Sequence, residues 1–152
     1  MGSKVDDPAA RRVYIDPMTK TVTAAVLLIG DELLSGRTQD TNLKTIATFI
    51  APLGVQVKEA RVVSDEPERI ADAVNALRSA YDYVFTTGGI GPTHDDKTAD
   101  AVALAFGVPI GVRDDAKAIL VAHYGAEDKL NEARLRMARI PECASLIANP
   151  VS

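Results

Sequence analysis

The chain of 152 residues is 47% hydrophobic and 25% charged, a composition that favours one folded domain over a disordered chain. Its formal net charge of -4 gives no overall attraction to nucleic acids or anionic membranes, and no apolar stretch approaches the roughly 20 residues that cross a bilayer. A single cysteine, Cys143, excludes an internal disulfide and a thiolate zinc cluster. We therefore expect a cytoplasmic protein. From its charge and its apolar runs we expect no nucleic-acid and no membrane partner.

The N-terminal residues 1–17 carry mixed charge and two prolines without a sustained hydrophobic period. We interpret them as a flexible leader, either natural or left over from cloning. Met18 stands directly before the first strong apolar run and would itself serve as a start. The folded domain is expected to run from residue 18 to residue 152.

Apolar runs and periodic stretches then alternate along the chain. The run "VTAAVLLIG" at 22–30 is typical of a strand buried on both faces of a parallel sheet. Residues 43–54 repeat apolar side chains at helical spacing and predict a helix. The polar residues 40–42 that precede them suit its N-terminus. Residues 55–63 alternate well enough to predict a second strand.

The same alternation continues through the middle of the chain. Residues 65–80 place an apolar stripe on one helical face, and Asp65 with Glu68 predicts a capping box at the start of this helix. The β-branched and aromatic run at 83–87 predicts a short strand, and 98–107 predicts a helix that ends at its glycine.

Two more helices are expected at 114–124 and 127–139. Alternating strands and helices predict βαβ units and a mostly parallel sheet between helical layers, an α/β fold. In such sheets ligands bind at the carboxyl ends of the strands. The loops after Ile29, Val63 and Thr87 are therefore expected to meet at one site.

The loop after the 83–87 strand is rich in glycine. Gly88, Gly89 and Gly91 let the backbone turn sharply and approach a ligand closely, with the positive end of the next helix behind them, which favours phosphate. An ordinary strand-to-helix turn explains the same glycines. The loop is not a Walker sequence, because no Gly-Lys-Ser/Thr follows.

Two carboxylates follow these glycines. Asp95 and Asp96 beside a phosphate would oppose its binding unless a divalent cation such as Mg²⁺ lies between them. They are therefore candidate metal ligands. The alternative is that one of them caps the helix and complements its dipole.

The loop after the first strand adds a second set of polar candidates. Asp31 or Glu32 could add a metal ligand or orient a water, and Arg37 could pair with phosphate, although acids in a loop are usually solvated surface. Three arginines near the C-terminus are interpreted as a solvated helix face: Arg134, Arg136 and Arg139.

With "GDELLSGRTQDTN", "SDEPERI" and "TTGGIGPTHDDKT" in this order, the chain resembles the molybdopterin-binding MoaB/Mog-like domain. The likeness covers roughly residues 20 to 149 and is greatest to the domain at the N-terminus of the competence/damage-inducible protein A (CinA) family. It implies a three-layer α/β/α sandwich, usually in a homo-oligomer (dimer or trimer), that binds a small-molecule phosphate ester. The implied ligand is molybdopterin or a nucleotide pyrophosphate.

The resemblance also implies activities and residues. Relatives of this fold serve molybdopterin adenylylation with Mg²⁺ and ATP, molybdate insertion or, in the CinA-like branch, metal-dependent hydrolysis of ADP-ribose and related dinucleotides. By position Asp96 and Asp65 are similar to the functional aspartates of the family, and Asp31 and Glu32 match its first motif. The residues that match the binding loop are Gly88, Gly89, Ile90, Gly91, Pro92, Thr93 and Thr98.

One departure from the family pattern leaves alternatives open. Relatives continue past the Ile-Pro-Glu stretch into a further strand and a Pro-Gly-x-Pro loop, whereas this sequence ends at Ser152. The domain is therefore expected to lack its C-terminal strand segment. The alternative to a divalent-metal-dependent pyrophosphatase is a role in molybdenum cofactor biosynthesis or a noncatalytic molybdopterin-binding or oligomerisation module. A nicotinamide-dependent dehydrogenase is disfavoured by the glycine spacing.

Overall fold

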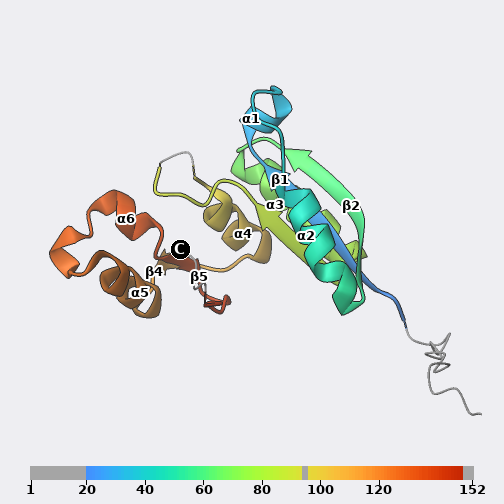
Figure 1. The fold of residues 1–152 in the computed structure, drawn as a ribbon. Helices are drawn as coiled ribbons and strands as arrows, with labels where there is room; N and C mark the ends of the chain where they lie inside the picture. Colours follow the sequence, from blue (N-terminus) through green and yellow to red (C-terminus); the bar gives the residue numbers. More distant parts are fainter. Residues whose placement is uncertain (1–19, 94–95, 149–152) are drawn as a thin grey trace, which may run out of the picture.

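The computed structural model describes residues 20–93 and 96–148, and the leader expected at 1–17 lies outside them (Figure 1). Its main sheet has three strands in the order β2-β1-β3, and both pairs of neighbours are parallel. The strands are β1 (Val22–Ile29), β2 (Val55–Val63) and β3 (Tyr83–Thr87). The helices that follow them are α2 (Asn42–Ile50), α3 (Pro67–Ala80) and α4 (Thr98–Phe106).

The central strand β1 is buried on both faces, as its continuous apolar sequence predicts. Ala25, Leu27 and Ile29 belong to a core cluster that they share with α3 and α4, and the alternate residues of β1 face the other side. Figure 1 shows α2 in front of the sheet and α3 behind it. The expected α/β layers with a parallel sheet are therefore confirmed.

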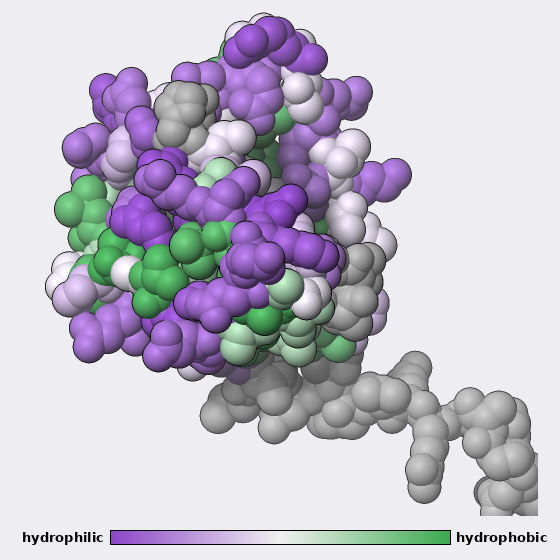
Figure 2. Space-filling model, turned by 90° about the vertical axis from the view of Figure 1, so that its left-hand side faces the viewer, coloured by the Kyte–Doolittle hydropathy of each residue, from purple (hydrophilic) through white to green (hydrophobic). Residues whose placement is uncertain are grey.

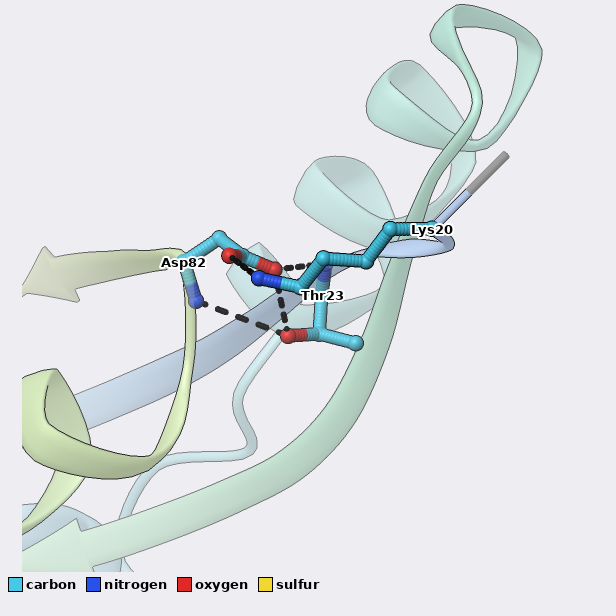
Figure 3. Close-up of polar contacts among 3 residues, drawn as sticks. All are labelled: Lys20, Thr23 and Asp82. Atoms are coloured by element: carbon cyan, nitrogen blue, oxygen red, sulfur yellow. Dashed lines mark hydrogen bonds and ion pairs between the residues drawn. The ribbon is translucent and has the colours of Figure 1, made fainter. Parts of the chain in front are cut away.

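A polar cluster joins the starts of β1 and β3 (Figure 3). The Asp82 carboxylate accepts a hydrogen bond from Lys20 Nζ at 2.8 Å and from the backbone N–H and the hydroxyl of Thr23 at 2.9 Å each. The Lys20 ammonium and these Thr23 donors hold the pKa of Asp82 well below its usual range.

The helix starts differ from the predictions. The loop at 30–42 contains a short helix, α1 (Asp31–Leu34), and the predicted helix 43–54 divides into α2 and a 3₁₀ turn, η1 (Ala51–Leu53). The capping box predicted at Asp65 and Glu68 is wrong. Helix α3 starts at Pro67 with Glu66 as its N-cap and without a side-chain cap, because the Asp65 carboxylate contacts another loop.

The C-terminal segment is a smaller antiparallel pair with helices on it. Strands β4 (Ile110–Val112) and β5 (Arg139–Pro141) pair with each other, and α5 (Asp114–Tyr124) confirms the predicted 114–124 helix. The single helix predicted at 127–139 is wrong. The segment contains a 3₁₀ turn η2 (Glu127–Lys129) and α6 (Glu132–Arg136), because Asn131 caps a new helix and β5 pairs with β4.

The surface of this C-terminal segment is mixed in character. Figure 2 shows the face that lies on the left of Figure 1, where apolar side chains gather among polar ones. Val112 of β4 and Ile119 of α5 are among the exposed apolar residues of the chain. Within residues 20–93 and 96–148, no helix has the length and apolar character that a bilayer crossing needs.

Candidate functional site

The three loops at the carboxyl ends of the strands meet, as the sequence predicts. The Gly30 N–H donates to the Val63 carbonyl oxygen at 3.1 Å, and the Asp31 N–H donates to Oδ2 of Asp65 at 3.1 Å. Loop contacts of this kind place the first two sequence motifs side by side. Asp31 and Asp65 are thus brought together, through the backbone of the first and the carboxylate of the second.

The glycine loop is fitted closely to its surroundings. Gly88 has φ +98°, and a Cβ on it would lie 2.0 Å from the Ile29 carbonyl oxygen. Gly89 has φ +59°, and its Cβ would lie 2.6 Å from Oγ1 of Thr98. Side chains at these two positions would collide with the structure, so both need glycine.

Thr98 anchors the glycine loop to the start of α4. Its side chain is 3% exposed, its Oγ1 donates to the Gly88 carbonyl oxygen at 2.8 Å, and its N–H donates to the Gly89 carbonyl oxygen at 3.1 Å. A buried hydroxyl that makes such bonds fixes the loop against the helix. Thr98 therefore shapes the predicted binding loop from beneath.

Asp96 closes the second half of the loop. Its Oδ2 accepts hydrogen bonds from the Thr93 N–H at 2.7 Å and from the Thr93 hydroxyl. Burial raises the pKa of Asp96, but the hydrogen bonds from Thr93 and from the Gly91 backbone outweigh it and leave the pKa below its ordinary value. Asp96 is therefore ionised at neutral pH and shapes the loop.

A cavity of about 460 Å³ opens beside this loop and the N-terminal end of α4. Its walls combine backbone of the glycine loop, the start of α4 and the turn between α6 and β5. The lining residues are Pro67, Gly89, Ile90, Gly91, Asp96, Lys97, Ala99, Asp100, Arg136, Met137, Arg139 and Ile140. This size and mixed lining suit a small organic ligand.

Three basic side chains line the cavity, a role that the sequence pattern did not predict for any of them. Arg136 Nη1 lies 3.4 Å from the Thr93 carbonyl oxygen, and Arg139 forms two hydrogen bonds with Asp100 at 2.9 and 2.6 Å. Lys97 and Arg136 have no carboxylate partner within the described part of the chain. They give the cavity the positive charge that an anionic ligand requires.

The interpretation of these arginines as a solvated helix face is wrong for Arg139, which lies in strand β5, whereas Arg136 is an exposed residue of helix α6 that also lines the cavity. The helix ends at Arg136 and a strand begins at Arg139, so the two residues reach the cavity from different elements. Asn131, a helix-capping residue in the middle of the predicted helix, was the signal that the long helix would break.

The remaining candidates lie around this centre. Glu32 lines a second cavity of about 150 Å³ on the Gly88 side of the loop, together with residues 38–42. Arg37 is exposed, donates from Nε to the Ser35 hydroxyl at 2.9 Å and lines neither cavity. Pro92 and Thr93 are exposed. The candidate ligand Asp95 lies outside the described residues.

Among the residues that the structure describes, no group of three or more His, Cys, Asp and Glu side chains is placed to hold a metal ion. Mg²⁺ is commonly held by one or two carboxylates together with phosphate oxygens, and this mode needs no such cage. Asp65 is not among the residues that line the cavity, but it lies next to Gly89, which is, since its Oδ1 would be 3.7 Å from a Cβ on that glycine.

Comparison with known proteins supports the fold and the motifs. The family model described as "Probable molybdopterin binding domain" matches residues 25–145. A "CinA-like protein" of Citrifermentans bemidjiense is 41% identical over 84% of this chain and 31% of its own length. A "Probable FAD synthase" of Caenorhabditis briggsae is 49% identical over 59% of this chain and 17% of its own.

A solved structure extends the comparison to three dimensions. The CinA protein of Thermoplasma acidophilum superposes with a TM-score of 0.80 and is 36% identical, with 88% of this chain and 79% of that chain covered. The chain spans at most half of the length of the curated relatives named above. On its family match, its motifs and this superposition, the chain belongs to the molybdopterin-binding, MoaB/Mog-like family and is similar to the CinA-like proteins within it.

Proposed function

We propose that the chain binds a nucleotide pyrophosphate such as ADP-ribose beside the glycine loop and hydrolyses its pyrophosphate bond with the help of a divalent metal ion. One observation carries this proposal: a single cavity joins the Gly89–Gly91 backbone, the start of α4 and the cationic side chains Lys97 and Arg136. Backbone N–H groups, a helix N-terminus and Arg or Lys side chains are the usual partners of phosphate oxygens.

The names of relatives support an ADP-containing ligand. A CinA-like relative is 41% identical over 84% of this chain, and a nematode relative is named a probable FAD synthase. FAD and ADP-ribose both contain adenosine diphosphate in a pyrophosphate linkage, so one phosphate-binding loop could serve both. The cavity volume of about 460 Å³ is in the range of small-molecule sites.

The residues around the cavity would have different roles in binding and in hydrolysis. Lys97 and Arg136 neutralise and orient the pyrophosphate, the glycine loop approaches its oxygens, and Asp65 positions the attacking water. Asp65 and Asp96 would hold the metal, which would withdraw charge from the phosphate oxygens. In the reaction, water cleaves the P–O–P bond, and the products are AMP and ribose 5-phosphate.

The test compares two arginines of α6. We expect Arg136→Ala to weaken ADP-ribose binding about 10- to 100-fold, because a charge-assisted hydrogen bond contributes about 1.5 to 3 kcal/mol. Arg134→Ala is the matched control, since the Arg134 guanidinium lies over the Tyr124 ring, outside the cavity. Isothermal titration calorimetry measures the binding, and the appearance of AMP with and without Mg²⁺ measures hydrolysis.

The outcomes separate binding from catalysis. Equal affinities of the Arg134 and Arg136 variants for ADP-ribose would show that the anion does not bind in this cavity. Unchanged turnover in Asp65→Asn or in Asp96→Asn would show that the substituted carboxylate takes no part in the reaction. The Asn variants keep a hydrogen-bond acceptor, so the loop contacts of Asp96 are disturbed less than by Ala.

A noncatalytic molybdopterin-binding module is the second candidate. It is favoured by the contacts of Asp96, whose carboxylate is engaged by Thr93 and Gly91 and so has a structural role without any metal. Tight binding of molybdopterin that does not change with Mg²⁺, together with no AMP from ADP-ribose, would select this candidate over the hydrolase.

A further inference from the structure

One residue of the glycine loop is large, apolar and open to solvent. Ile90 is 73% exposed, and it lines the cavity of about 460 Å³. Its backbone is held on both sides. The Gly89 carbonyl oxygen accepts a hydrogen bond from the Thr98 N–H at 3.1 Å, and the Gly91 backbone donates to the Asp96 carboxylate. The loop therefore keeps an apolar side chain at a cavity, where a ligand can cover it.

Two more apolar side chains line the same cavity from the C-terminal segment. Met137 directly follows α6, Ile140 belongs to β5, and both are half-buried. These two residues lie far from Ile90 in the sequence, so the fold brings the three side chains to one cavity. The cavity thus has an apolar part as well as a cationic one.

The apolar part adjoins the cationic part. Arg136 directly precedes Met137, and Lys97 follows the glycine loop at the N-cap of α4. An inorganic anion such as pyrophosphate would pair with Lys97 and Arg136 and leave the apolar side chains in water. A ligand with an apolar group beside its phosphates would cover both parts and add a hydrophobic contribution to that of the charges.

The chemistry of this cavity favours a flat heterocyclic ring over an alkyl chain. The thioether of a methionine such as Met137 makes favourable contacts with aromatic rings. The same cavity is lined by Gly89 and Gly91, where backbone groups lie beside the apolar side chains. A nitrogen heterocycle can form hydrogen bonds along its edge while its faces contact apolar groups, and an alkyl chain has no polar edge.

We propose that Ile90, Met137 and Ile140 form a subsite for the adenine ring of the ligand and make the chain selective for nucleoside diphosphates over inorganic pyrophosphate. This inference rests on the proposed function, because it assigns the organic part of the same ligand. Lys97 and Arg136 bind the phosphates, and the three apolar side chains determine which phosphate compound is accepted.

The test compares two ligands that share one anion. Adenosine α,β-methylene diphosphate resists cleavage between its phosphorus atoms, and methylenediphosphonate is the same anion without the nucleoside. We expect the wild-type chain to bind the nucleotide at least about tenfold more tightly than the diphosphonate, and Ile90→Ser to reduce this ratio about fivefold. Ile90→Leu should keep the ratio, because it conserves the apolar volume.

Ile119→Ser is the matched control, since Ile119 is 57% exposed on α5 and lies outside the cavity. Isothermal titration calorimetry with Mg²⁺ gives the affinities, and circular dichroism confirms that each variant is folded. A ratio that falls in Ile90→Ser and is kept in Ile90→Leu and Ile119→Ser supports the subsite.

Two results would overturn the subsite and leave the anion site in place. The first is a wild-type chain that binds both ligands equally well, and the second is an equal ratio in Ile90→Ser and Ile119→Ser. A wild-type chain that binds neither ligand would overturn the anion site of the proposed function, and the subsite with it.

Discussion

Gly88 connects the fold to the site at a single backbone position. Its φ of +98° is rarely adopted by L-residues, and its α-carbon faces the end of β1 so closely that a Cβ would lie 2.0 Å from the Ile29 carbonyl oxygen. Any side chain would push the glycine loop away from the strand on which it rests. The same residue that permits the turn also sets the distance between the loop and the sheet.

Two glycine substitutions separate these effects. We expect Gly88→Ala to cost about 3 kcal/mol or more of unfolding free energy, because backbone strain and a steric collision add. Gly36→Ala should cost about 1 kcal/mol, since Gly36 has φ +72° and open space around its Cβ position. Urea denaturation measures both. Equal costs would show that the contact with Ile29 relaxes without penalty.

At the level of elements, the cavity depends on how the C-terminal segment is held against α4. Arg139 at the start of β5 forms two hydrogen bonds with Asp100 in the first turn of α4, and Arg136 lies three residues before it. A bidentate pair fixes orientation as well as distance. The pair thus keeps Arg136 beside the glycine loop, as a positioning contact that need not touch the ligand.

This role predicts a local effect of breaking the pair. We expect Asp100→Asn to increase amide hydrogen exchange in β5 and to weaken ADP-ribose binding about three- to tenfold, while global stability falls by about 1 kcal/mol or less because the pair is partly exposed. Asp115→Asn is the control, since Asp115 pairs with Arg113 in the same segment but lies outside the cavity. Equal exchange in β5 for both variants would contradict the role.

The elements that the sequence predicted well are those set by local pattern. Strand β1 reads as a buried strand because six consecutive residues from Ala24 are buried on both faces, and helix α3 carries one apolar stripe. The convergence of the three loops also followed, since parallel strands bring their carboxyl ends together. These features need no knowledge of distant contacts.

The features that the sequence did not predict depend on contacts between distant segments. Asp65 has the spacing of a helix cap, yet its carboxylate binds the Asp31 N–H of another loop. Arg139 has the spacing of an exposed helix face, yet it lies in β5, which pairs with β4, and it lines the cavity. In both cases a tertiary contact outcompeted a local preference of about 1 kcal/mol.

For the whole molecule, ion pairs and hydrogen bonds of charged side chains set the dependence of stability on pH. Several carboxyl groups have lowered pKa values because a neighbouring Lys or Arg stabilises the charged form. Arg61 lowers the pKa of Glu59, Lys20 lowers that of Asp82, and Lys117 lowers that of Glu127. Two of the bases respond in the opposite direction, since the pKa values of Lys20 and Lys117 are raised.

These shifts predict a stability plateau with two limbs. A lowered carboxyl pKa contributes stability that is complete above the ordinary value near 4 and is lost as the pH falls through the folded-state pKa. A raised lysine pKa contributes stability that is complete below about 10.5 and is lost as the pH rises through the folded-state pKa. We therefore expect the thermal midpoint to be highest between about pH 5.5 and 9.

Asp82→Asn tests the origin of both limbs, because the Lys20–Asp82 pair lowers the pKa of Asp82 and raises that of Lys20. The variant should have a lower midpoint at pH 7 and a shallower acid limb, because one carboxylate with a lowered pKa no longer titrates. Its alkaline limb should also flatten, since Lys20 loses its partner. Differential scanning calorimetry at constant ionic strength measures the midpoints. Parallel pH profiles for wild type and variant would mean that Asp82 contributes no proton linkage to the stability, in contradiction to its lowered pKa.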